Sequence, residues 1–381
     1  MMTFDFDERL DRRHSDSSKW NKFGDDVLPM WVADMDFRSP PCILEALHQR
    51  VEHGVFGYGG RPQELVDVVV ERMASRYQWQ IQPEWIVFLP GVVAGLNLSV
   101  RAFTAADETT IAPTPIYPPF RKSSVFAQRP QLNAPLRLEN DRWVMDLAAL
   151  ESQFTGKEKL LMLCNPQNPG GTIYTREELL QQLAFAQRHD LIVCSDEIHC
   201  DLLLDPDAKH IPFATLSPDA EQRSLTLLSP SKTFNIAGLG ASLAIIPDPQ
   251  LRKRFNTVRD GIVPSVDVLA LTAATAAWRD GEPWLQQLLP YLRTNRDRLV
   301  SAVNAMTGLT MTSPQATYLG WVDASALPVE NPTLFFQKAG LGFSPGADFG
   351  EKKFVRINFG CTSATLEEAI KRMDAAVKSV S

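Results

Sequence analysis

Short apolar runs, rich in β-branched residues, recur through the middle of this chain and alternate with segments of helical character. Six of these runs are long enough to be strands: Ile86–Leu89, Thr109–Ala112, Lys159–Leu163, Leu191–Cys194, Ser224–Leu228 and Ala241–Ile246. Their apolar residues are continuous rather than alternating, which is typical of strands covered on both faces. The helical segments include Gly95–Phe103, Val266–Trp278 and Thr175–His189, which begins with a capping-box pair, Thr175 and Glu178. This alternation predicts a doubly wound, mostly parallel α/β sheet that binds its ligand at the carboxyl ends of its strands.

The two ends of the chain differ from this alternating core. The first 45 residues contain the segment WVADMDF and have little helical character. After the core come a long helix, two strands and a closing helix, expected at 282–306, 317–322, 354–359 and 364–377. We therefore expect a large α/β domain over residues 46–285 and a smaller α+β domain built from residues 1–45 and 286–381.

Composition and charge exclude several classes of protein. The 381 residues include 38 Lys and Arg against 45 Asp and Glu, a net charge of −7, so no basic excess indicates binding to nucleic acid. No apolar run reaches the ~18 residues that span a bilayer, and the charged N-terminus is unlike a secretory signal. The five cysteines are scattered without a CxxC pair, which argues against disulfides and structural zinc. We expect a cytoplasmic protein with no metal ion, no nucleic-acid partner and no membrane span.

Unusual polar sequences follow three of the expected strands. The third, fourth and fifth strands run into NPQNPGG at 165–171, SDEIH at 195–199 and SPSK at 229–232. Taken singly, an Asn-Pro pair is more often a turn, an Asp after a strand is often a helix cap, and such a Lys is usually solvated. His199 matches no zinc spacing. All three segments nevertheless follow strands at the edge where a doubly wound sheet has its binding site, so their side chains are expected to lie close together.

The combination of residues in these segments suits one cofactor, pyridoxal phosphate. A lysine that forms a Schiff base needs a dry pocket where its amine can lose a proton, and Lys232 is the candidate. The ring acts as an electron sink when an acidic partner keeps its nitrogen protonated, and Asp196 is the candidate carboxylate. Asn168 and His199 are candidate donors to the phenolate oxygen of the ring, and Tyr117 offers an aromatic face that stacks on it.

The phosphate of such a cofactor needs backbone N–H groups at the start of a helix together with hydroxyl groups. Gly91, Val92 and Val93 lie between an expected strand and an expected helix and offer the N–H groups. Ser229 and Ser231 offer the hydroxyl groups. We expect these five residues to form the phosphate-binding end of the site.

With these segments in place, the chain resembles the fold-type I pyridoxal-phosphate enzymes of the aminotransferase class I/II superfamily, nearly from end to end. The motifs that carry the resemblance are PGVVAGL at 90–96, NPGG at 168–171, DEIH at 196–199, SPSK at 229–232 and FVRINFG at 354–360. Finer features resemble the MalY/PatB family of cystathionine β-lyases, namely LPMWVADMDF at 28–37, DEIHCD at 196–201 and SKTFNIAGL at 231–239. The motifs are long and follow the family's order, so the chain is identified as a member of this family.

The resemblance implies a role for each residue that matches a motif. Lys232 is then the Schiff-base lysine and the base that removes the α-proton of the substrate, while Asp196 pairs with the pyridine nitrogen. Asn168 is the donor to the phenolate oxygen, and His199 stands where many aminotransferases have a tyrosine for the same oxygen. Arg356 matches the arginine that binds the substrate α-carboxylate, a task suited to a planar fork of donors.

The same resemblance implies further positions and one departure. Tyr117 is expected to stack on the ring and so to take part in catalysis, and Ala33 of WVADMDF is expected to contact the substrate. Tyr58 resembles a tyrosine that reaches the phosphate of the neighbouring subunit in a homodimer with its sites at the interface. Many aminotransferases have a phosphate-binding arginine eight residues after the lysine, where this chain has Gly240. The phosphate is therefore expected to depend more on backbone amides, the two serines and the other subunit.

The resemblance allows two reactions on one scaffold, and both begin with removal of the α-proton. A C–S β-lyase then expels a thiolate from Cβ, so that L-cystathionine or a related cysteine S-conjugate gives a thiol (homocysteine from cystathionine), pyruvate and ammonia. An aminotransferase instead returns the proton to the cofactor and releases a keto acid. The MalY/PatB-like segments favour the lyase. A further alternative is a regulatory protein partner, resembling the maltose-regulon modulator, because some relatives in this branch bind a transcriptional activator.

Overall fold

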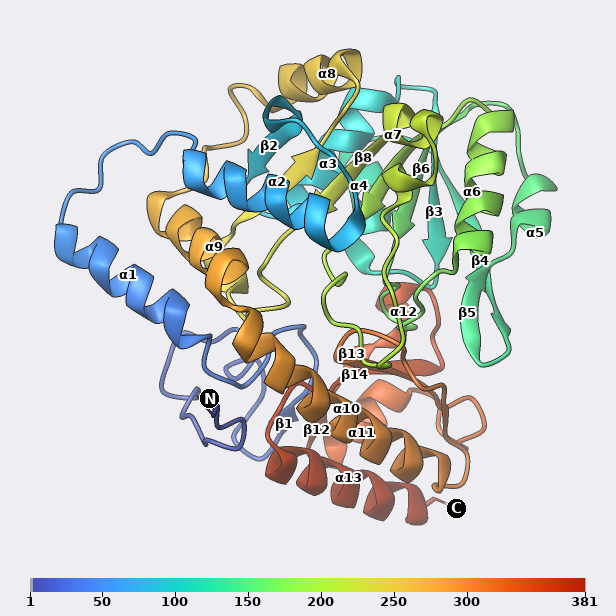
Figure 1. The fold of residues 1–381 in the computed structure, drawn as a ribbon. Helices are drawn as coiled ribbons and strands as arrows, with labels where there is room; N and C mark the ends of the chain where they lie inside the picture. The colour runs from blue at the N-terminus through green and yellow to red at the C-terminus, as the bar shows by residue number, and fades with distance from the viewer. Residues whose placement is uncertain (1–2, 381) are drawn as a thin grey trace.

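One large sheet forms the centre of the molecule in the computed structural model, which describes residues 3–380 (Figure 1). Its eight strands lie in the order β2-β9-β8-β7-β6-β3-β4-β5. Their bounds are β2 Ile86–Leu89, β3 Thr109–Thr114, β4 Gln131–Glu139, β5 Arg142–Met145, β6 Glu158–Cys164, β7 Ile192–Asp196, β8 Ser224–Leu228 and β9 Ser242–Ile245. Neighbours from β8 to β4 pair in parallel, whereas β9 and β5 run antiparallel to the strands beside them. The predicted mostly parallel sheet is confirmed.

Both faces of this sheet are covered, as the continuous apolar runs predicted. Along β6, Leu160 and Met162 pack on one face with helices α3 (Val92–Phe103), α4 (Pro118–Ala127) and α8 (Pro249–Arg259). Leu161 and Leu163 pack on the other face with helix α6 (Arg176–Arg188). Alternate residues of a strand point to opposite faces, so a strand buried on both sides must be apolar throughout. The helices are α1 Pro41–His53, α2 Gln63–Tyr77, α3 Val92–Phe103, α4 Pro118–Ala127, α5 Leu147–Glu151, α6 Arg176–Arg188, α7 Pro218–Arg223, α8 Pro249–Arg259, α9 Val268–Asp280, α10 Glu282–Asn304, α11 Pro332–Lys338, α12 Gly346–Phe349 and α13 Ser363–Lys378.

Local signals located several elements well. The strands β2 and β8 have the predicted bounds, and α6 begins with the predicted capping box. In that box the Glu178 N–H donates to Thr175 Oγ1 (3.2 Å), and the Thr175 N–H donates to Glu178 Oε2 (2.7 Å). Several elements had not been predicted, among them α1, α2, α4, α8 and the hairpin formed by β4 and β5.

The chain ends come together in a second layer of structure below the large sheet (Figure 1). A four-stranded sheet has the order β10-β11-β14-β13, with β10 Thr310–Met311, β11 Leu319–Asp323, β13 Ser344–Pro345 and β14 Phe354–Asn358. Near the N-terminus, β1 (Leu28–Pro29) pairs in parallel with β12 (Leu341–Gly342). The helix α10 crosses the expected boundary at residue 285 without a break. The division into 46–285 and 1–45 with 286–381 therefore stays a prediction.

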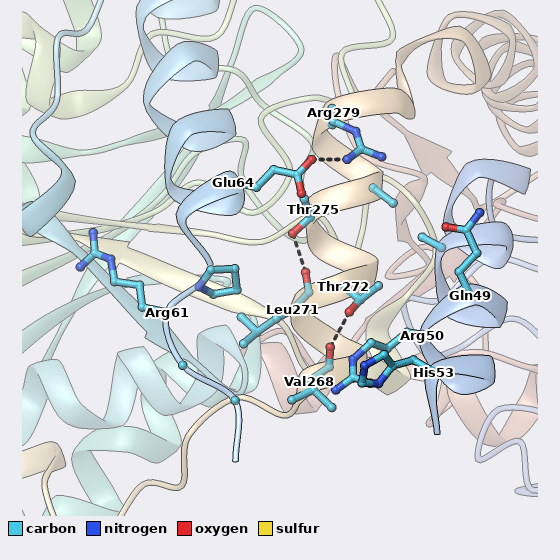
Figure 2. A pocket seen from close by; sticks show the side chains of 15 residues that line it. Gln49, Arg50, His53, Arg61, Glu64, Val268, Leu271, Thr272, Thr275 and Arg279 are labelled. Carbon is cyan, nitrogen blue, oxygen red and sulfur yellow. Dashed lines mark hydrogen bonds and ion pairs between the residues drawn. The ribbon is translucent and has the colours of Figure 1, made fainter. Parts of the chain in front are cut away.

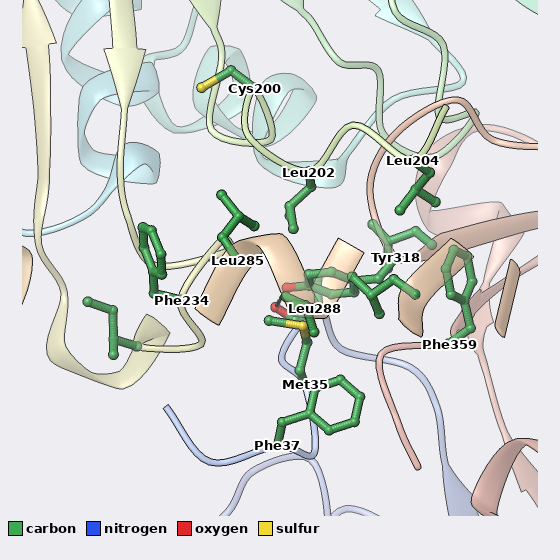
Figure 3. Packing of buried hydrophobic residues seen from close by; sticks show 14 of the residues in the cluster. Met35, Phe37, Cys200, Leu202, Leu204, Phe234, Leu285, Leu288, Tyr318 and Phe359 are labelled. Carbon is green, nitrogen blue, oxygen red and sulfur yellow. Dashed lines mark hydrogen bonds between the residues drawn. The ribbon is translucent and has the colours of Figure 1, made fainter. Parts of the chain in front are cut away.

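A buried apolar cluster joins the N-terminal segment to both parts of the molecule (Figure 3). It includes residues from the segment before α1, from the loops after β7 and β8, from α10 and from positions next to strands β11 and β14: Met35, Phe37, Leu202, Phe234, Leu285, Leu288, Tyr318 and Phe359. Burial of one such large side chain contributes roughly 1.5–3 kcal/mol. The segment that contains WVADMDF is therefore fixed beside the carboxyl edge of the large sheet. Within residues 3–380, no helix has the length and apolarity needed to cross a membrane.

Candidate active site

Lys232 lies in the loop that follows β8, at the carboxyl edge of the large sheet. Its side chain is partly buried, and its Nζ donates a hydrogen bond to the Ala33 carbonyl oxygen (2.6 Å). Burial, together with the nearby charge of Arg356, lowers the pKa of the Lys232 amine to about 8. About a tenth of this amine is therefore neutral and nucleophilic at pH 7, far more than for an ordinary lysine.

Asp196 is the last residue of β7, and its carboxylate is buried without a cationic partner. Its Oδ1 accepts a hydrogen bond from the Ile198 N–H (3.1 Å), and it forms no ion pair with another residue of the described chain. Burial raises the pKa of Asp196 to about 7, and neighbouring Glu197 adds to the effect. Because a buried carboxylate is costly unless paired, this site is suited to a bound cationic N–H group.

Arg356 on β14 is a buried cation that faces the same edge of the large sheet. Its Nη1 donates to Asn168 Oδ1 (3.0 Å), and its Nη2 donates to the Trp31 carbonyl oxygen (2.8 Å). The guanidinium lies 4.7 Å from the centre of the Phe349 ring. Burial lowers the pKa of Arg356 to about 10, so it stays charged at neutral pH. Since it pairs with no carboxylate among residues 3–380, it can bind one from a ligand.

Asn168 and Tyr117 are brought together by the ends of β6 and β3. The Tyr117 N–H donates to the Asn168 carbonyl oxygen (3.0 Å), and Tyr117 itself precedes the first residue of α4. Asn168 Oδ1 is occupied by Arg356, which leaves the Asn168 Nδ2 group to act as a donor. Burial raises the pKa of Tyr117, so its phenol is neutral at physiological pH.

His199 is buried a few residues beyond Asp196. Burial, with the charges of Lys232 and Arg356, lowers the pKa of His199 to about 3, so the imidazole is neutral. Its Nδ1 is buried and has no hydrogen-bond partner in the protein, and its ring lies edge-on to Tyr318 with 6.3 Å between the ring centres. A buried, unpaired ring nitrogen is costly, and a bound ligand atom would satisfy it.

The start of α3 and the loop after β8 form the other end of the site. Gly91 precedes α3 with φ of +154°, and Val92 and Val93 open the helix, whose first N–H groups have no partner within the helix. The Ser229 and Ser231 hydroxyls are hydrogen-bonded to one another (2.8 Å) and buried. Backbone N–H groups and hydroxyls at a helix start are suited to a phosphate.

Gly240 explains why no arginine occupies the position eight residues after Lys232. Its φ is +64°, a left-handed conformation that favours glycine. A Cβ at this position would lie 2.9 Å from the Pro90 carbonyl oxygen, directly before the Gly91 loop. Any side chain here would therefore displace the loop expected to bind the phosphate.

Tyr58 is the one predicted site residue that the structure does not bring to the others within a single chain. It belongs to residues 51–60, all exposed, and its side chain is fully exposed (110%). Next to this segment is a pocket of about 680 Å³ between α1, residues 59–62 and α9 (Figure 2). Arg50 and His53 line it from α1, and the ion pair between Glu64 and Arg279 lies at its far end (Figure 2).

Two residues of the site were not found from the sequence. The Tyr318 hydroxyl donates to the Ala33 carbonyl oxygen (3.0 Å), the same atom that accepts from Lys232. Asn358 Nδ2 donates to the Val32 and Asp34 carbonyl oxygens, at 2.6 Å each. Asn358 stands in the FVRINFG motif and could have been suspected, whereas nothing in the local sequence distinguishes Tyr318. Ala33 was predicted to contact the substrate; in the structure its carbonyl oxygen accepts hydrogen bonds from Lys232 and Tyr318.

The site offers charged and hydrogen-bonding side chains but no cluster of metal ligands. Across residues 3–380, no group of three or more His, Cys, Asp or Glu side chains is arranged to hold a metal ion. All five cysteines are free thiols, and four of them are buried. In the described chain, the unpaired Arg356, the unpaired Asp196 and the start of α3 with the two serines of the loop after β8 suit an organic ligand with a carboxylate, a basic ring nitrogen and a phosphate.

Comparisons with known proteins agree with this geometry. The family model for aminotransferases of class I and II matches residues 25–373. Cystathionine β-lyase PatB of Bacillus subtilis (strain 168) is 39% identical, over 98% of this chain and 99% of PatB. The crystal structure of OvoB is 62% identical with a TM-score of 0.97, over 99% of this chain and all of OvoB. Cystalysin from Treponema denticola, whose structure contains pyridoxal 5′-phosphate, is 30% identical with a TM-score of 0.95, over the whole of both chains. This chain belongs to the aminotransferase class I and II family, in its MalY/PatB branch.

Proposed function

We propose that this chain is a pyridoxal-phosphate-dependent C–S β-lyase. Its substrate is L-cystathionine or a related cysteine S-conjugate, and its products are a thiol, pyruvate and ammonia. The assignment to a lyase is supported by the similarity to PatB, a cystathionine β-lyase, across nearly all of both chains. The cofactor is supported by the similarity to cystalysin and by the residues at the carboxyl edge of the large sheet.

One observation carries the cofactor assignment: the Asp196 carboxylate is buried, unpaired and has a pKa of about 7. A protonated pyridine nitrogen would supply the missing cation and return that pKa towards its ordinary range. The unpaired His199 Nδ1 and the Asn168 Nδ2 group fit the ring oxygen, and the α3 start with Ser229 and Ser231 fits the phosphate. The residues of the chain therefore fit pyridoxal phosphate both at its ring and at its phosphate.

When bound, the cofactor supplies an electron sink for the electrons of the broken α-C–H bond. Arg356 binds the α-carboxylate of the substrate by charge and hydrogen bonding and thereby fixes the orientation of the α-carbon. Lys232, once its amine is free, accepts the α-proton, and its lowered pKa keeps that amine neutral often enough to do so. Asp196 keeps the ring nitrogen protonated through all steps of the reaction. The thiolate then leaves from Cβ.

A product assay distinguishes the lyase from an aminotransferase. Purified holoenzyme is given L-cystathionine with and without a keto-acid acceptor, and thiol, pyruvate and ammonia are followed, with Lys232→Ala as the inactive control. A lyase forms the three products at equal rates without an acceptor. Turnover that requires the acceptor, yields a new amino acid and releases no thiol would identify an aminotransferase instead. S-alkyl and S-aryl cysteines in the same assay define which thioether is preferred.

The protein is proposed to act in the cytoplasm as a homodimer whose sites lie at the subunit interface. Support comes from the exposed apolar residues around Tyr58, which include Val51, Val55 and Phe56 at 53–62% exposure. Contiguous exposed apolar side chains mark an interaction surface. A regulatory protein partner stays a prediction, and a pull-down with wild type and Lys232→Ala would separate it from catalysis.

A further inference from the structure

Residues 31–37 form no helix or strand, yet side chains from distant parts of the chain hold most of their carbonyl groups. Six of these carbonyl groups are held by residues of the site itself or of its lysine loop: Trp31 by Arg356 (2.8 Å), Val32 and Asp34 by Asn358 (2.6 Å each), Ala33 by Lys232 (2.6 Å) and Tyr318 (3.0 Å), and Met35 and Phe37 by Asn235 (2.9 and 2.7 Å). Backbone groups without secondary structure need such partners when buried. The position of this segment, which we call the Ala33 loop, is therefore set by side chains.

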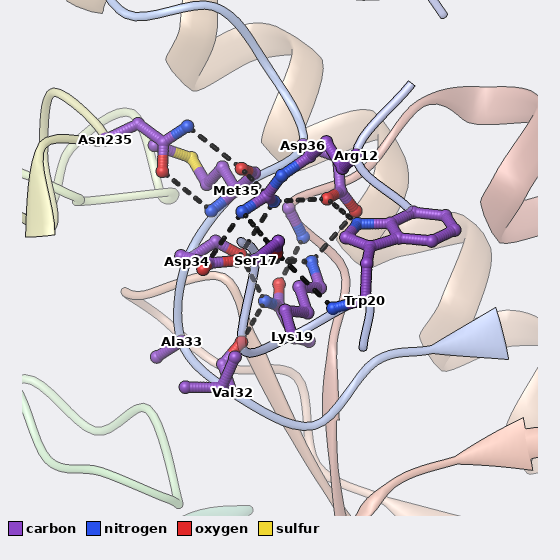
Figure 4. A network of polar contacts seen from close by, with 12 residues as sticks. Arg12, Ser17, Lys19, Trp20, Val32, Ala33, Asp34, Met35, Asp36 and Asn235 are labelled. Atoms are coloured by element: carbon purple, nitrogen blue, oxygen red, sulfur yellow. Dashed lines mark hydrogen bonds and ion pairs between the residues drawn. The ribbon is translucent and has the colours of Figure 1, made fainter. Parts of the chain in front are cut away.

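A cluster of charged side chains contacts the Ala33 loop (Figure 4). Lys19 is 1% exposed, and its Nζ donates to Asp36 Oδ2 (2.8 Å) and to the Asp34 carbonyl oxygen (3.1 Å). Arg12 donates to Asp36 Oδ1 (2.7 Å), to Asp34 Oδ1 (3.2 Å) and to the Met35 carbonyl oxygen (3.2 Å). A buried ion cluster is often no more stabilising than apolar residues of the same volume. The cluster is better explained by the position that its hydrogen bonds impose on the Ala33 loop.

The loop that contains Lys232 is tied to the same segment from the other side. Asn235, three residues after Lys232, accepts a hydrogen bond from the Met35 N–H (2.9 Å). It also donates to the Met35 and Phe37 carbonyl oxygens, at 2.9 and 2.7 Å. The Ala33 carbonyl is thus held between the charged cluster and Asn235, at 2.6 Å from the Lys232 amine.

We propose that Lys19, Asp36 and Arg12 are positioning residues for catalysis: they hold the Ala33 carbonyl where it orients the free amine of Lys232. This inference rests on the proposed function, in which the substrate α-C–H bond breaks, its electron pair is delocalised over the substrate and the bound cofactor, and the proton forms an N–H bond on Lys232. A hydrogen bond to Ala33 restricts the rotation of that amine and keeps its lone pair available in one orientation. A displacement of about 1 Å at a reacting group costs on the order of 100-fold in rate.

The test removes the ion pair between Lys19 and Asp36 and leaves Arg12 paired with Asp34. The double variant Lys19→Met/Asp36→Asn deletes one cation and one anion, so the cost of an uncompensated charge is avoided. The matched control is Arg142→Met, which breaks an ion pair with Glu178 far from the Ala33 loop. Three properties are measured on each holoenzyme: the thermal midpoint, the visible circular dichroism of the bound cofactor, and the exchange of the L-alanine α-proton in D2O. L-Alanine has no leaving group, so the exchange reports on Lys232 independently of thiolate release.

We expect the double variant to bind the cofactor, to melt within a few degrees of wild type and to exchange the α-proton about 100-fold more slowly. Its cofactor dichroism should change, whereas Arg142→Met should melt earlier with unchanged exchange and dichroism. Exchange by the double variant at the wild-type rate would overturn the proposal, and absence of exchange in wild type would overturn the proposed function with it.

If the double variant fails to fold, Asn235→Gly takes its place. Asn235 has φ of +56°, which glycine adopts without strain, so this change removes only the hydrogen bonds to Met35 and Phe37. The same loss of exchange is expected, and a wild-type exchange rate would contradict the role of the Ala33 loop.

Discussion

Replacing Asp196 with asparagine should stabilise the protein without its cofactor and weaken the cofactor-bound form. Asn keeps the size of the side chain and removes a carboxylate that is 3% exposed and has no cationic partner among the described residues. The pKa of Asp196 is about 7 in the folded chain against an ordinary value of 3.8. Ionisation is therefore disfavoured by folding, and the apoprotein loses stability as the pH rises from about 4 to about 7.

The size of the effect follows from the two pKa values. Their difference, about 3 pH units, corresponds to about 4 kcal/mol of lost stability at pH 8 and about 2 kcal/mol at pH 5. The apoprotein of Asp196→Asn should therefore exceed wild type in unfolding free energy by up to these amounts, with the larger gain at pH 8. With the cofactor bound, Asp196→Asn should have a lower unfolding free energy than wild type, because the protonated ring nitrogen loses its ionic partner.

Urea unfolding of the apoprotein and the holoprotein at pH 5 and pH 8 measures these differences. The matched control is Asp201→Asn, another buried carboxylate. Burial raises the pKa of Asp201, but the attraction of Arg72 and Arg76 is stronger and brings it below its ordinary range. Removal of this carboxylate leaves Arg72 unpaired, so Asp201→Asn should destabilise the apoprotein. If apoprotein Asp196→Asn is no more stable than wild type at pH 8, Asp196 is not an isolated buried charge.

Three further experiments test other parts of the site. Borohydride reduction of the holoenzyme followed by peptide mass mapping should place the cofactor on Lys232, and a label on any other lysine would overturn the assignment. Arg356→Ala should lower kcat/KM roughly 30- to 4000-fold, which corresponds to a loss on the order of 2–5 kcal/mol in transition-state binding. The loss should occur for every amino acid tested, because all of them have an α-carboxylate. A loss confined to one substrate would instead show that Arg356 binds the side chain of that substrate. Mixing inactive Lys232→Ala with inactive Tyr58→Ala subunits should restore part of the activity through heterodimers with one intact site, and full activity of Tyr58→Ala alone would show that Tyr58 does not serve the partner's site.

Local sequence patterns were sufficient for the large sheet and for the residues at its edge. Mostly apolar runs at 86–89 and 224–228 identified β2 and β8, because most positions of a strand buried on both faces are apolar; in β8 the exceptions are the buried Ser224 and Thr226. The capping box of α6 was equally local, since its two hydrogen bonds join residues three apart. Lys232 and Asp196 were found in the same way, as polar residues directly after buried strands.

The hairpin of β4 and β5 and the helices α2 and α4 were missed because their partners lie elsewhere in the chain. In β4, buried Ala134 and Leu136 alternate with more exposed residues, so the run has no continuous apolar stretch. The N-terminal segment was likewise read only as a motif. Its conformation depends on Asn358 and Tyr318, more than 280 residues away, and no local pattern encodes such a contact.

Sequence motifs were enough to identify the residues that carry the chemistry, whereas the hydrogen-bond partners and pKa values of these residues depend on the folded chain. Arg356 meets Asn168 across 188 positions of the chain, and this contact fixes which atom of the Asn168 amide remains a donor. The pKa values of about 7 for Asp196 and about 8 for Lys232 arise first from burial. Burial is a property of all the elements packed around a group rather than of its neighbours in sequence, so these values exist only in the folded chain.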